Sequence, residues 1–269
     1  MKKIIFSDID RTLCVGGNVS LKNINSINKY QNIGGLFVLV SGRVINYTKK
    51  LAKSINASQY IICTNGGVIY DWKENNIIYK NQINYYALKR LFELSNKYDA
   101  RIIFGGLKTT YTNKIKYPSE EVLILNITKD MYNENPITQV TISHKNIDVV
   151  KKIIEEVEKI SDVKILNRHR SLYDSSFKDN GNIWIDIAPK DVNKGKAVLK
   201  LLEYLNINIE DSVRIGDDLN DLSMFMDKGV NIAVDNAIDE LKEKANFITK
   251  PCEKDGIFHA IEKIINEKL

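Results

Sequence analysis

The chain has 269 residues, of which 43% are hydrophobic and 27% charged, a size that suits one large domain carrying a smaller one. Its 39 basic and 34 acidic residues leave a formal charge of only +5, which does not indicate a dedicated nucleic-acid-binding protein. Its three cysteines are too far apart for a disulfide framework or a zinc site, and no apolar run approaches the ~20 residues that span a bilayer, so we expect a soluble, cytoplasmic protein with reduced thiols and no membrane partner.

The first quarter of the chain alternates strand-like apolar runs with amphipathic helices. In chain order, we expect a strand, a helix, a strand, a helix and a strand over residues 3–7, 20–31, 36–40, 44–55 and 60–63. This order is typical of a parallel sheet, because each parallel crossover usually carries a helix.

The middle of the chain differs in character, because strands predominate there. We expect strands over residues 101–104, 121–126, 138–143, 163–166 and 183–187, and helices over residues 85–97 and 147–160. Each of these two helices precedes more than one apolar run, which indicates an α+β insert rather than a doubly wound sheet. We place the insert at residues 83–185, which leaves residues 1–82 and 186–269 for the core.

The last quarter resumes the alternating pattern of the first. We expect a helix over residues 194–205 and strands over 212–215, 231–234 and 247–249, with further helices over 221–227, 236–245 and 256–267. The predicted fold class is therefore α/β: a Rossmann-like parallel-sheet core with helices on both faces, interrupted by an inserted α+β domain.

Four short polar segments mark one edge of this predicted core. They are residues 8–12 (DIDRT), 41–43 (SGR), 193–195 (NKG) and 216–221 (GDDLND). Three of them follow expected strands, and the third segment opens an expected helix. Open α/β sheets bind ligands at the carboxyl ends of their strands, and a helix amino terminus favours an anion.

Together, these segments contain the groups that phosphoryl transfer to a carboxylate requires: a nucleophile, ligands for a divalent cation, donors for the phosphoryl oxygens and a second carboxyl group. Each segment alone also has an ordinary explanation. Aspartates after strands cap helices or close turns, Ser41 suits a helix cap, and a lysine such as Lys194 is usually exposed. Their combination at one edge favours a catalytic site.

With these segments in this order, the chain resembles the haloacid dehalogenase superfamily of aspartate-nucleophile phosphatases. Within it, the chain is similar to the Cof-like group, whose large cap is inserted between the second and third motifs, and residues 64–67, 231–237 and 254–257 are further stretches typical of that group. The resemblance covers nearly the whole chain. It implies a Mg2+-dependent phosphomonoester hydrolase that acts on a small phosphorylated metabolite, such as a sugar phosphate, through an aspartyl phosphate.

The resemblance also implies a role for each motif residue. Asp8 would attack the phosphorus, and Asp10 would protonate the leaving alcohol and then activate water. The implied Mg2+ ligands are Asp8, Asp10 through its backbone carbonyl, Asp217 and Asp221. The implied phosphate-binding residues are Ser41, Gly42, Lys194 and Asn220, and the supporting residues are Thr12 and Arg43.

Two departures from the family pattern stand in the motifs, since Arg11 and Ser41 occupy positions where many members have glycine and threonine. Substrate choice is expected to lie in the cap, where the candidates are Arg168, Arg170 and Tyr173, although a solvated loop also explains that cluster. A sugar-phosphate phosphotransferase or mutase and a non-catalytic sensor of phosphorylated metabolites remain alternatives. The sequence predicts no oligomeric state.

Overall fold

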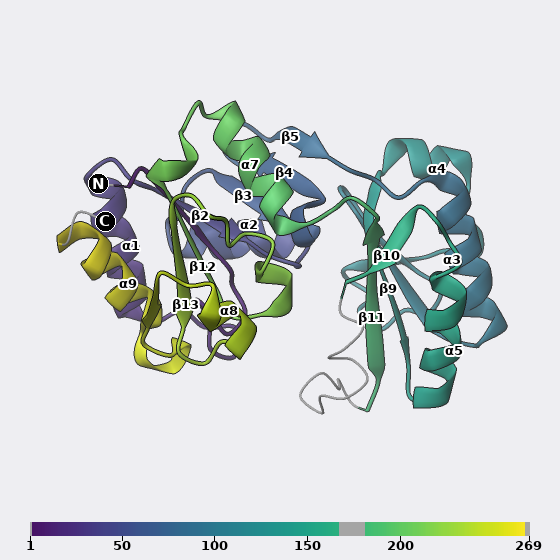
Figure 1. Cartoon of the computed structure of the whole chain (residues 1–269). Coiled ribbons are helices and arrows are strands. Elements are labelled where there is room, and N and C mark those ends of the chain that lie inside the picture. The colour runs from purple at the N-terminus through teal and green to yellow at the C-terminus, as the bar shows by residue number, and fades with distance from the viewer. Residues whose placement is uncertain (1, 167–180, 267–269) are drawn as a thin grey trace. The chain divides into compact units, whose positions relative to one another are not determined.

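The computed structural model of the protein describes residues 2–166 and 181–266, and the chain forms two compact units (Figure 1). Unit 1 contains Met1–Tyr79 and Asn193–Leu269, and unit 2 contains Lys80–Val192. Unit 2 therefore begins before, and ends after, the insert that we placed at residues 83–185. The difference at the second boundary has a simple reason: the strand β11 (Ile183–Pro189) pairs along its length within unit 2, so the division follows this strand instead of cutting it.

Unit 1 is built on an eight-stranded sheet with the order β14-β13-β12-β1-β2-β3-β4-β5. The strands β14, β13, β12, β1, β2 and β3 run parallel to one another, and β4 runs antiparallel to β3. The bounds are β1 (Ile4–Ser7), β2 (Leu36–Val40), β3 (Tyr60–Cys63), β4 (Val68–Asp71), β5 (Asn76–Lys80), β12 (Ser212–Gly216), β13 (Val230–Val234) and β14 (Phe247–Thr249). The parallel core strands are confirmed, whereas β4 and β5 were missing from the sequence-based prediction.

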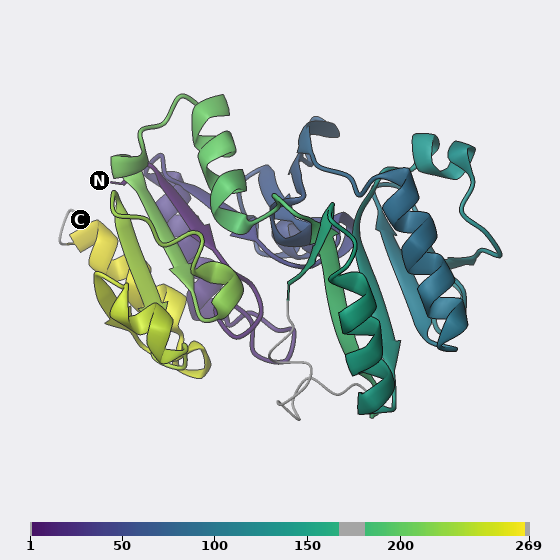
Figure 2. The same ribbon diagram turned by 45° about the vertical axis from the view of Figure 1, so that its right-hand side comes forward.

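Helices cover both faces of this sheet, as predicted. They are α1 (Leu21–Asn32), α2 (Ile45–Ser54), α7 (Lys194–Tyr204), α8 (Asp239–Glu243) and α9 (Gly256–Asn266). The helices α1 and α9 lie side by side on one face, and α7 lies on the other (Figures 1 and 2). Right-handed crossovers explain the two faces, because the chain moves outward from β1 in one direction through β2 and β3, and in the other through β12 and β13.

Two of the helices predicted in the last quarter were wrong or too long. No α-helix forms over 221–227. Residue 221 ends a 3-10 turn, η4 (Leu219–Asp221), and in the turns that follow, the amides of Met224 and Phe225 donate to carbonyls three residues earlier. An α-helix needs donation to the fourth preceding residue. The helix expected over 236–245 is shortened to α8, because the residues before it form a turn tied to the Asp217 carbonyl by the Ile238 amide.

Unit 2 has a six-stranded sheet of order β10-β11-β9-β6-β7-β8, antiparallel except for the β7–β8 pair. Its elements are α3 (Tyr85–Lys97), β6 (Arg101–Gly106), β7 (Thr110–Thr112), β8 (Glu121–Leu123), α4 (Lys129–Glu134), β9 (Ile137–His144), α5 (Ile147–Val157), β10 (Val163–Ile165) and β11. The helices α3 and α5 pack on one face of the sheet over a continuous apolar core (Figure 1). The inserted α+β domain is therefore confirmed, with β7 and α4 as additions. Within residues 2–166 and 181–266, no helix is long and apolar enough to cross a membrane.

Candidate active site

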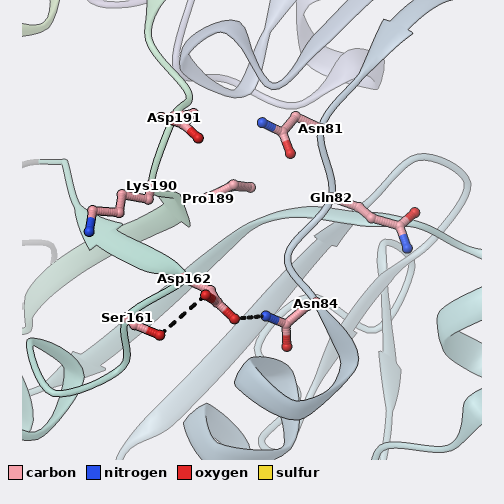
Figure 3. A pocket seen from close by; sticks show the side chains of 8 residues that line it. All are labelled: Asn81, Gln82, Asn84, Ser161, Asp162, Pro189, Lys190 and Asp191. Atoms are coloured by element: carbon pink, nitrogen blue, oxygen red, sulfur yellow. Dashed lines mark hydrogen bonds between the residues drawn. The ribbon is translucent and has the colours of Figure 1, made fainter.

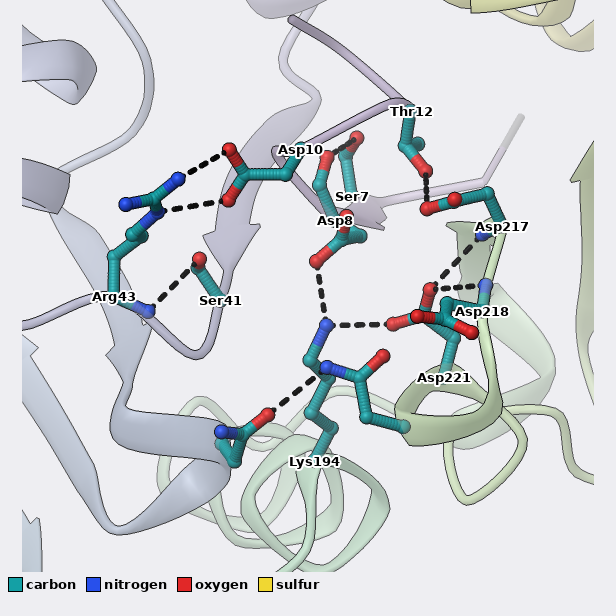
Figure 4. Close-up of polar contacts among 12 residues, drawn as sticks. Ser7, Asp8, Asp10, Thr12, Ser41, Arg43, Lys194, Asp217, Asp218 and Asp221 are labelled. Atoms are coloured by element: carbon teal, nitrogen blue, oxygen red, sulfur yellow. Dashed lines mark hydrogen bonds and ion pairs between the residues drawn. The ribbon is translucent and has the colours of Figure 1, made fainter. Parts of the chain in front are cut away.

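The four polar segments meet at the carboxyl edge of the unit 1 sheet (Figure 4). Asp8 follows β1, Ser41 follows β2 and Asp217 follows β12, while Lys194 is the first residue of α7. The parallel register makes the ends of β1, β2 and β12 nearly level, so the loops that follow them begin side by side. Sheet topology thus joins segments that are more than two hundred residues apart in the chain.

A buried lysine lies between two buried carboxylates at the centre of the site. Lys194 Nζ is 2.5 Å from Asp8 Oδ1 and 2.6 Å from Asp221 Oδ1. Lys194 and Asp221 have no exposed surface, and Asp8 is 6% exposed. The glycine after the lysine is required by packing, because a Cβ on Gly195 would lie 1.8 Å from the Ser223 carbonyl oxygen. The expectation of an ordinary exposed lysine is thereby excluded.

The segment after β12 folds around the second oxygen of the Asp221 carboxylate. Asp221 Oδ2 accepts hydrogen bonds from the backbone amides of Asp217, at 2.9 Å, and Asp218, at 3.1 Å. A Cβ on Gly216 would lie 2.6 Å from that same oxygen, so glycine allows the close approach. Thr12 Oγ1 donates to Asp217 Oδ1 at 2.9 Å and thereby connects the loop after β1 with the loop after β12.

Three buried carboxylates form a group that suits a metal ion. One oxygen each from Asp8, Asp217 and Asp221 lies within 4.8 Å of the others. The ammonium of Lys194 contacts two of them, and the half-exposed guanidinium of Arg11 approaches Asp217 to 3.8 Å. Among the residues that the structure describes, these carboxylates provide the all-oxygen donor set that hard divalent cations such as Mg2+ prefer.

Burial and mutual repulsion disturb the protonation of this cluster. Burial raises the pKa of Asp8 well above its ordinary value, and Asp221 and Asp217 add to the increase while Lys194 opposes it. Burial and the neighbouring Asp221 also raise the pKa of Asp217 to about 7. For Lys194, burial lowers the pKa, but the attraction of Asp221 and Asp8 outweighs that effect and raises it, so the side chain is an ammonium ion. Added positive charge here would relieve the repulsion among the carboxylates.

Asp10 points away from the buried cluster and toward the loop after β2 (Figure 4). Its carboxylate, 45% exposed, receives two hydrogen bonds from the Arg43 guanidinium, at 3.0 Å from Nε and 2.9 Å from Nη2. Arg43 also stacks on Tyr47, with the guanidinium carbon 5.1 Å from the ring centre, and its amide donates to Ser41 Oγ at 3.1 Å. The structure therefore joins Asp10, Ser41 and Arg43. A metal contact from the Asp10 carbonyl stays a prediction.

Asn220 and Gly42 are joined through Asn65, to which the sequence assigned no role in the metal or phosphate site. Asn220 Nδ2 donates to Asn65 Oδ1 at 3.0 Å, and the Asn65 amide donates to the Ser41 carbonyl at 2.9 Å. A Cβ on Gly42 would lie 2.9 Å from Asn65 Nδ2. Asn65 follows β3 in a left-handed conformation, with φ of 56°. The sequence signal that could have indicated a site role for Asn65 is its position just after an expected strand.

Arg11 has a backbone conformation that suits glycine better than other residues, in line with the glycine that the family resemblance led us to expect at this position. Its φ is 65°, in the left-handed region that glycine adopts freely and other residues adopt only with strain. The side chain turns toward Asp217, as described above. Arginine therefore adds a positive charge beside the carboxylate cluster.

The cap candidates Arg168, Arg170 and Tyr173 lie outside the described residues. A pocket of about 240 Å³ does occur in unit 2 (Figure 3). It is lined by Asn81, Gln82, Asn84, Ser161, Asp162, Pro189, Lys190 and Asp191. The Asp162 carboxylate accepts hydrogen bonds from Asn84 Nδ2 and Ser161 Oγ. Of the predicted site residues that the structure describes, none is among those that line this pocket.

The fold and the site together define an α/β enzyme with a buried carboxylate–lysine centre at the carboxyl edge of its sheet. The chain belongs to the haloacid dehalogenase-like hydrolases, whose family model matches residues 5–261. As a member of this family it is a phosphatase, a phosphoric monoester hydrolase of small phosphorylated molecules, which confirms the enzyme class expected from the sequence.

Individual relatives resemble the chain over nearly its full length. It is 25% identical over 260 residues to 5-amino-6-(5-phospho-D-ribitylamino)uracil phosphatase YcsE of Bacillus subtilis, covering 96% of this chain and 94% of the relative. It is 26% identical over 265 residues to phosphoglycolate phosphatase of Methanobrevibacter smithii, with coverages of 96% and 94%. The crystal structure of a haloacid dehalogenase-like hydrolase from Bacteroides thetaiotaomicron has the same fold, with a TM-score of 0.84, 22% identity and coverages of 98% and 100%.

Proposed function

We propose that the chain is a Mg2+-dependent phosphomonoester hydrolase that forms an aspartyl phosphate on Asp8. One observation carries the proposal: Asp8 directly follows β1, and its buried carboxylate lies 2.5 Å from the Lys194 ammonium within a group of three carboxylates. A carboxylate of this kind is a competent nucleophile toward phosphorus when nearby positive charge reduces its repulsion from the phosphate.

The proposed reaction has two steps. An Asp8 oxygen attacks the phosphorus, the bond between phosphorus and the ester oxygen breaks, and the departing alcohol takes a proton from Asp10. Water then attacks the phosphorus of the aspartyl phosphate, gives a proton to Asp10, and the bond between phosphorus and the Asp8 oxygen breaks. Asp10 ends the cycle protonated, as it began, and inorganic phosphate leaves.

Positive charge and oxygen ligands in the site support these steps. Asp8, Asp217 and Asp221, with the Asp10 carbonyl, would hold Mg2+, which when bound would screen the nucleophile from the phosphate charge. The Lys194 ammonium stays charged in its buried position, and we assign it to the phosphoryl oxygens as well as to Asp8. Ser41, Gly42 and Asn220 complete the proposed phosphate site.

The Arg43–Asp10 ion pair must open for Asp10 to act as a proton shuttle, because the guanidinium favours the ionised carboxylate. The pair is half exposed, with side-chain exposures of 53% and 45%, so water and substrate compete for both groups when Asp10 must transfer a proton. We propose that Arg43 orients Asp10, and that Thr12 holds the loop through its bond to Asp217.

We propose a sugar phosphate or a related small phosphomonoester as substrate. Two relatives carry names that refer to such molecules, a phosphorylated ribitylaminouracil in one case and phosphoglycolate in the other. The two molecules in these names are both phosphomonoesters, but they differ in the rest of their structure. We therefore assign to this chain only the phosphomonoester as substrate class.

The proposal is tested by phosphate release from a panel of sugar, nucleotide, cofactor and glycolytic phosphoesters with Mg2+. Asp8→Asn is the control for contaminating phosphatases, because it removes the nucleophile with little change in volume. We expect release by the parent and none by the variant. Equal release by both would exclude Asp8 as nucleophile, transfer to added sugars in excess of release to water would identify a phosphotransferase, and binding without turnover would identify a sensor.

A further inference from the structure

Arg11, the strained residue in the loop after β1, forms hydrogen bonds through both its backbone amide and its backbone carbonyl. Arg11 has φ of 65°, and strain of this kind persists only where the surroundings hold it. Its amide donates to the Cys14 carbonyl at 3.1 Å, and its carbonyl accepts a hydrogen bond from Asn236 Nδ2 at 2.8 Å. The second of these bonds comes from a side chain more than two hundred residues away in the sequence.

The Asn236 side chain is itself held in one orientation. It follows β13, and its Oδ1 accepts a hydrogen bond from the Cys252 amide at 2.7 Å. If the Asn236 amide were rotated by half a turn, both hydrogen bonds would be lost, because Nδ2 would face the Cys252 amide and Oδ1 would face the Arg11 carbonyl. One asparagine thus connects the loop after β1, the turn after β13 and the segment after β14.

The placement of Asp10 depends on this backbone as well as on the Arg43 side chain. The ion pair that Asp10 forms with Arg43 is half exposed and must open when Asp10 turns to the leaving group, so the backbone then has to keep the carboxyl group in place. Arg11 stands between Asp10 and Thr12. Its carbonyl belongs to the peptide group shared with Thr12 and its amide to the one shared with Asp10, so holding both groups fixes the direction of the chain on either side. The Asn236 bond acts on the carbonyl of that residue.

We propose that Asn236 is a positioning residue for Asp10, acting by holding the Arg11 carbonyl. The inference rests on the proposed function, because it assigns Asn236 to the step in which Asp10 gives its proton to the departing alcohol. Without the bond, the loop relaxes, and Asp10 delivers the proton less well while Asp8 and Lys194 keep their mutual contact. A leaving group that needs no proton is then affected much less than one that does.

The test compares two aryl phosphates of similar shape, phenyl phosphate and p-nitrophenyl phosphate, in the full chain with Mg2+. Asn236→Asp keeps an acceptor for Cys252 but loses the donor to Arg11, and Asn236→Ala loses both. We expect both variants to lose about tenfold in kcat/KM for phenyl phosphate and less than about threefold for p-nitrophenyl phosphate. A merely structural defect lowers the active fraction and reduces both rates by the same factor.

Asn246→Ala is the matched control, because Asn246 Oδ1 also accepts a backbone hydrogen bond at 2.7 Å, from the Asn231 amide, away from the loop. Hydrogen exchange provides a second readout: a peptide covering residues 9–14 should exchange faster in both Asn236 variants and not in the control. Equal losses on the two substrates, or unchanged exchange, would overturn the role of Asn236. Failure of the proposed function gives a different result, namely no turnover by the parent or full turnover by Asp8→Asn, while the exchange result still stands.

Discussion

At the scale of single residues, Lys194 dominates the electrostatics of the site. Its ammonium is completely buried and contacts Asp8 and Asp221, so it offsets part of the repulsion in the cluster. Removing one partner from a buried charged group leaves the others uncompensated. The lysine is therefore expected to matter both for the fold and for the charge that develops on a transferred phosphoryl group.

We predict that Lys194→Ala lowers kcat/KM by a factor of about 10² to 10³, as loss of a single buried donor to a transition-state anion does in other enzymes. Steady-state kinetics on the best substrate of the panel measures the loss, with circular dichroism to verify that the variant is folded. A rate close to that of the parent would mean that Lys194 serves the fold alone.

At the scale of elements, the start of α7 depends on close packing. Asn193 caps the helix by accepting from the Lys196 amide at 2.7 Å, and the next turn of chain touches the segment after β12 at Gly195. The predicted helix 194–205 is confirmed because its apolar spacing is long and regular. The segment 221–227 has similar apolar residues but too few of them, and local turn bonds formed instead.

We predict that Gly195→Ala destabilises unit 1 by about 1–3 kcal/mol, the usual cost of forcing a methyl group into a close-packed contact. The added Cβ would lie 1.8 Å from the Ser223 carbonyl oxygen, so α7 must shift and Lys194 with it. Urea unfolding measures the change. Glu203→Ala, on an exposed position of the same helix, should stay within about 0.5 kcal/mol of the parent, and an equal effect of both substitutions would contradict the packing argument.

At the scale of the whole molecule, cation binding by the three-carboxylate group would be linked to the stability of unit 1. The carboxylates come from loops after β1 and β12, so a cation bound between them would oppose the separation of those strands. Binding to the folded state alone stabilises it by mass action.

We predict that MgCl2 raises the unfolding temperature of the parent, with a stabilisation of about 2.7 kcal/mol at one hundred times the dissociation constant. Scanning calorimetry with and without MgCl2, at equal ionic strength, measures the effect. Asp217→Asn should lose most of it, whereas Asp235→Asn, at an exposed position, should keep it. The same increase in the Asp217 variant would show that the cation binds elsewhere.

The sequence by itself determined the parallel core, the inserted domain, the family and the identity of the motif residues, because regular apolar spacing and short chemical motifs are local signals. Tertiary structure alone decided that Lys194 is buried between two carboxylates, that Asp10 pairs with Arg43, and that Asn65 and Asn236 hold the loops. These contacts join positions far apart in the chain, and their geometry depends on strand register, close approach at glycines and left-handed backbone at Arg11. No local pattern of residues specifies those distances, because they arise only when the sheet brings its loops together.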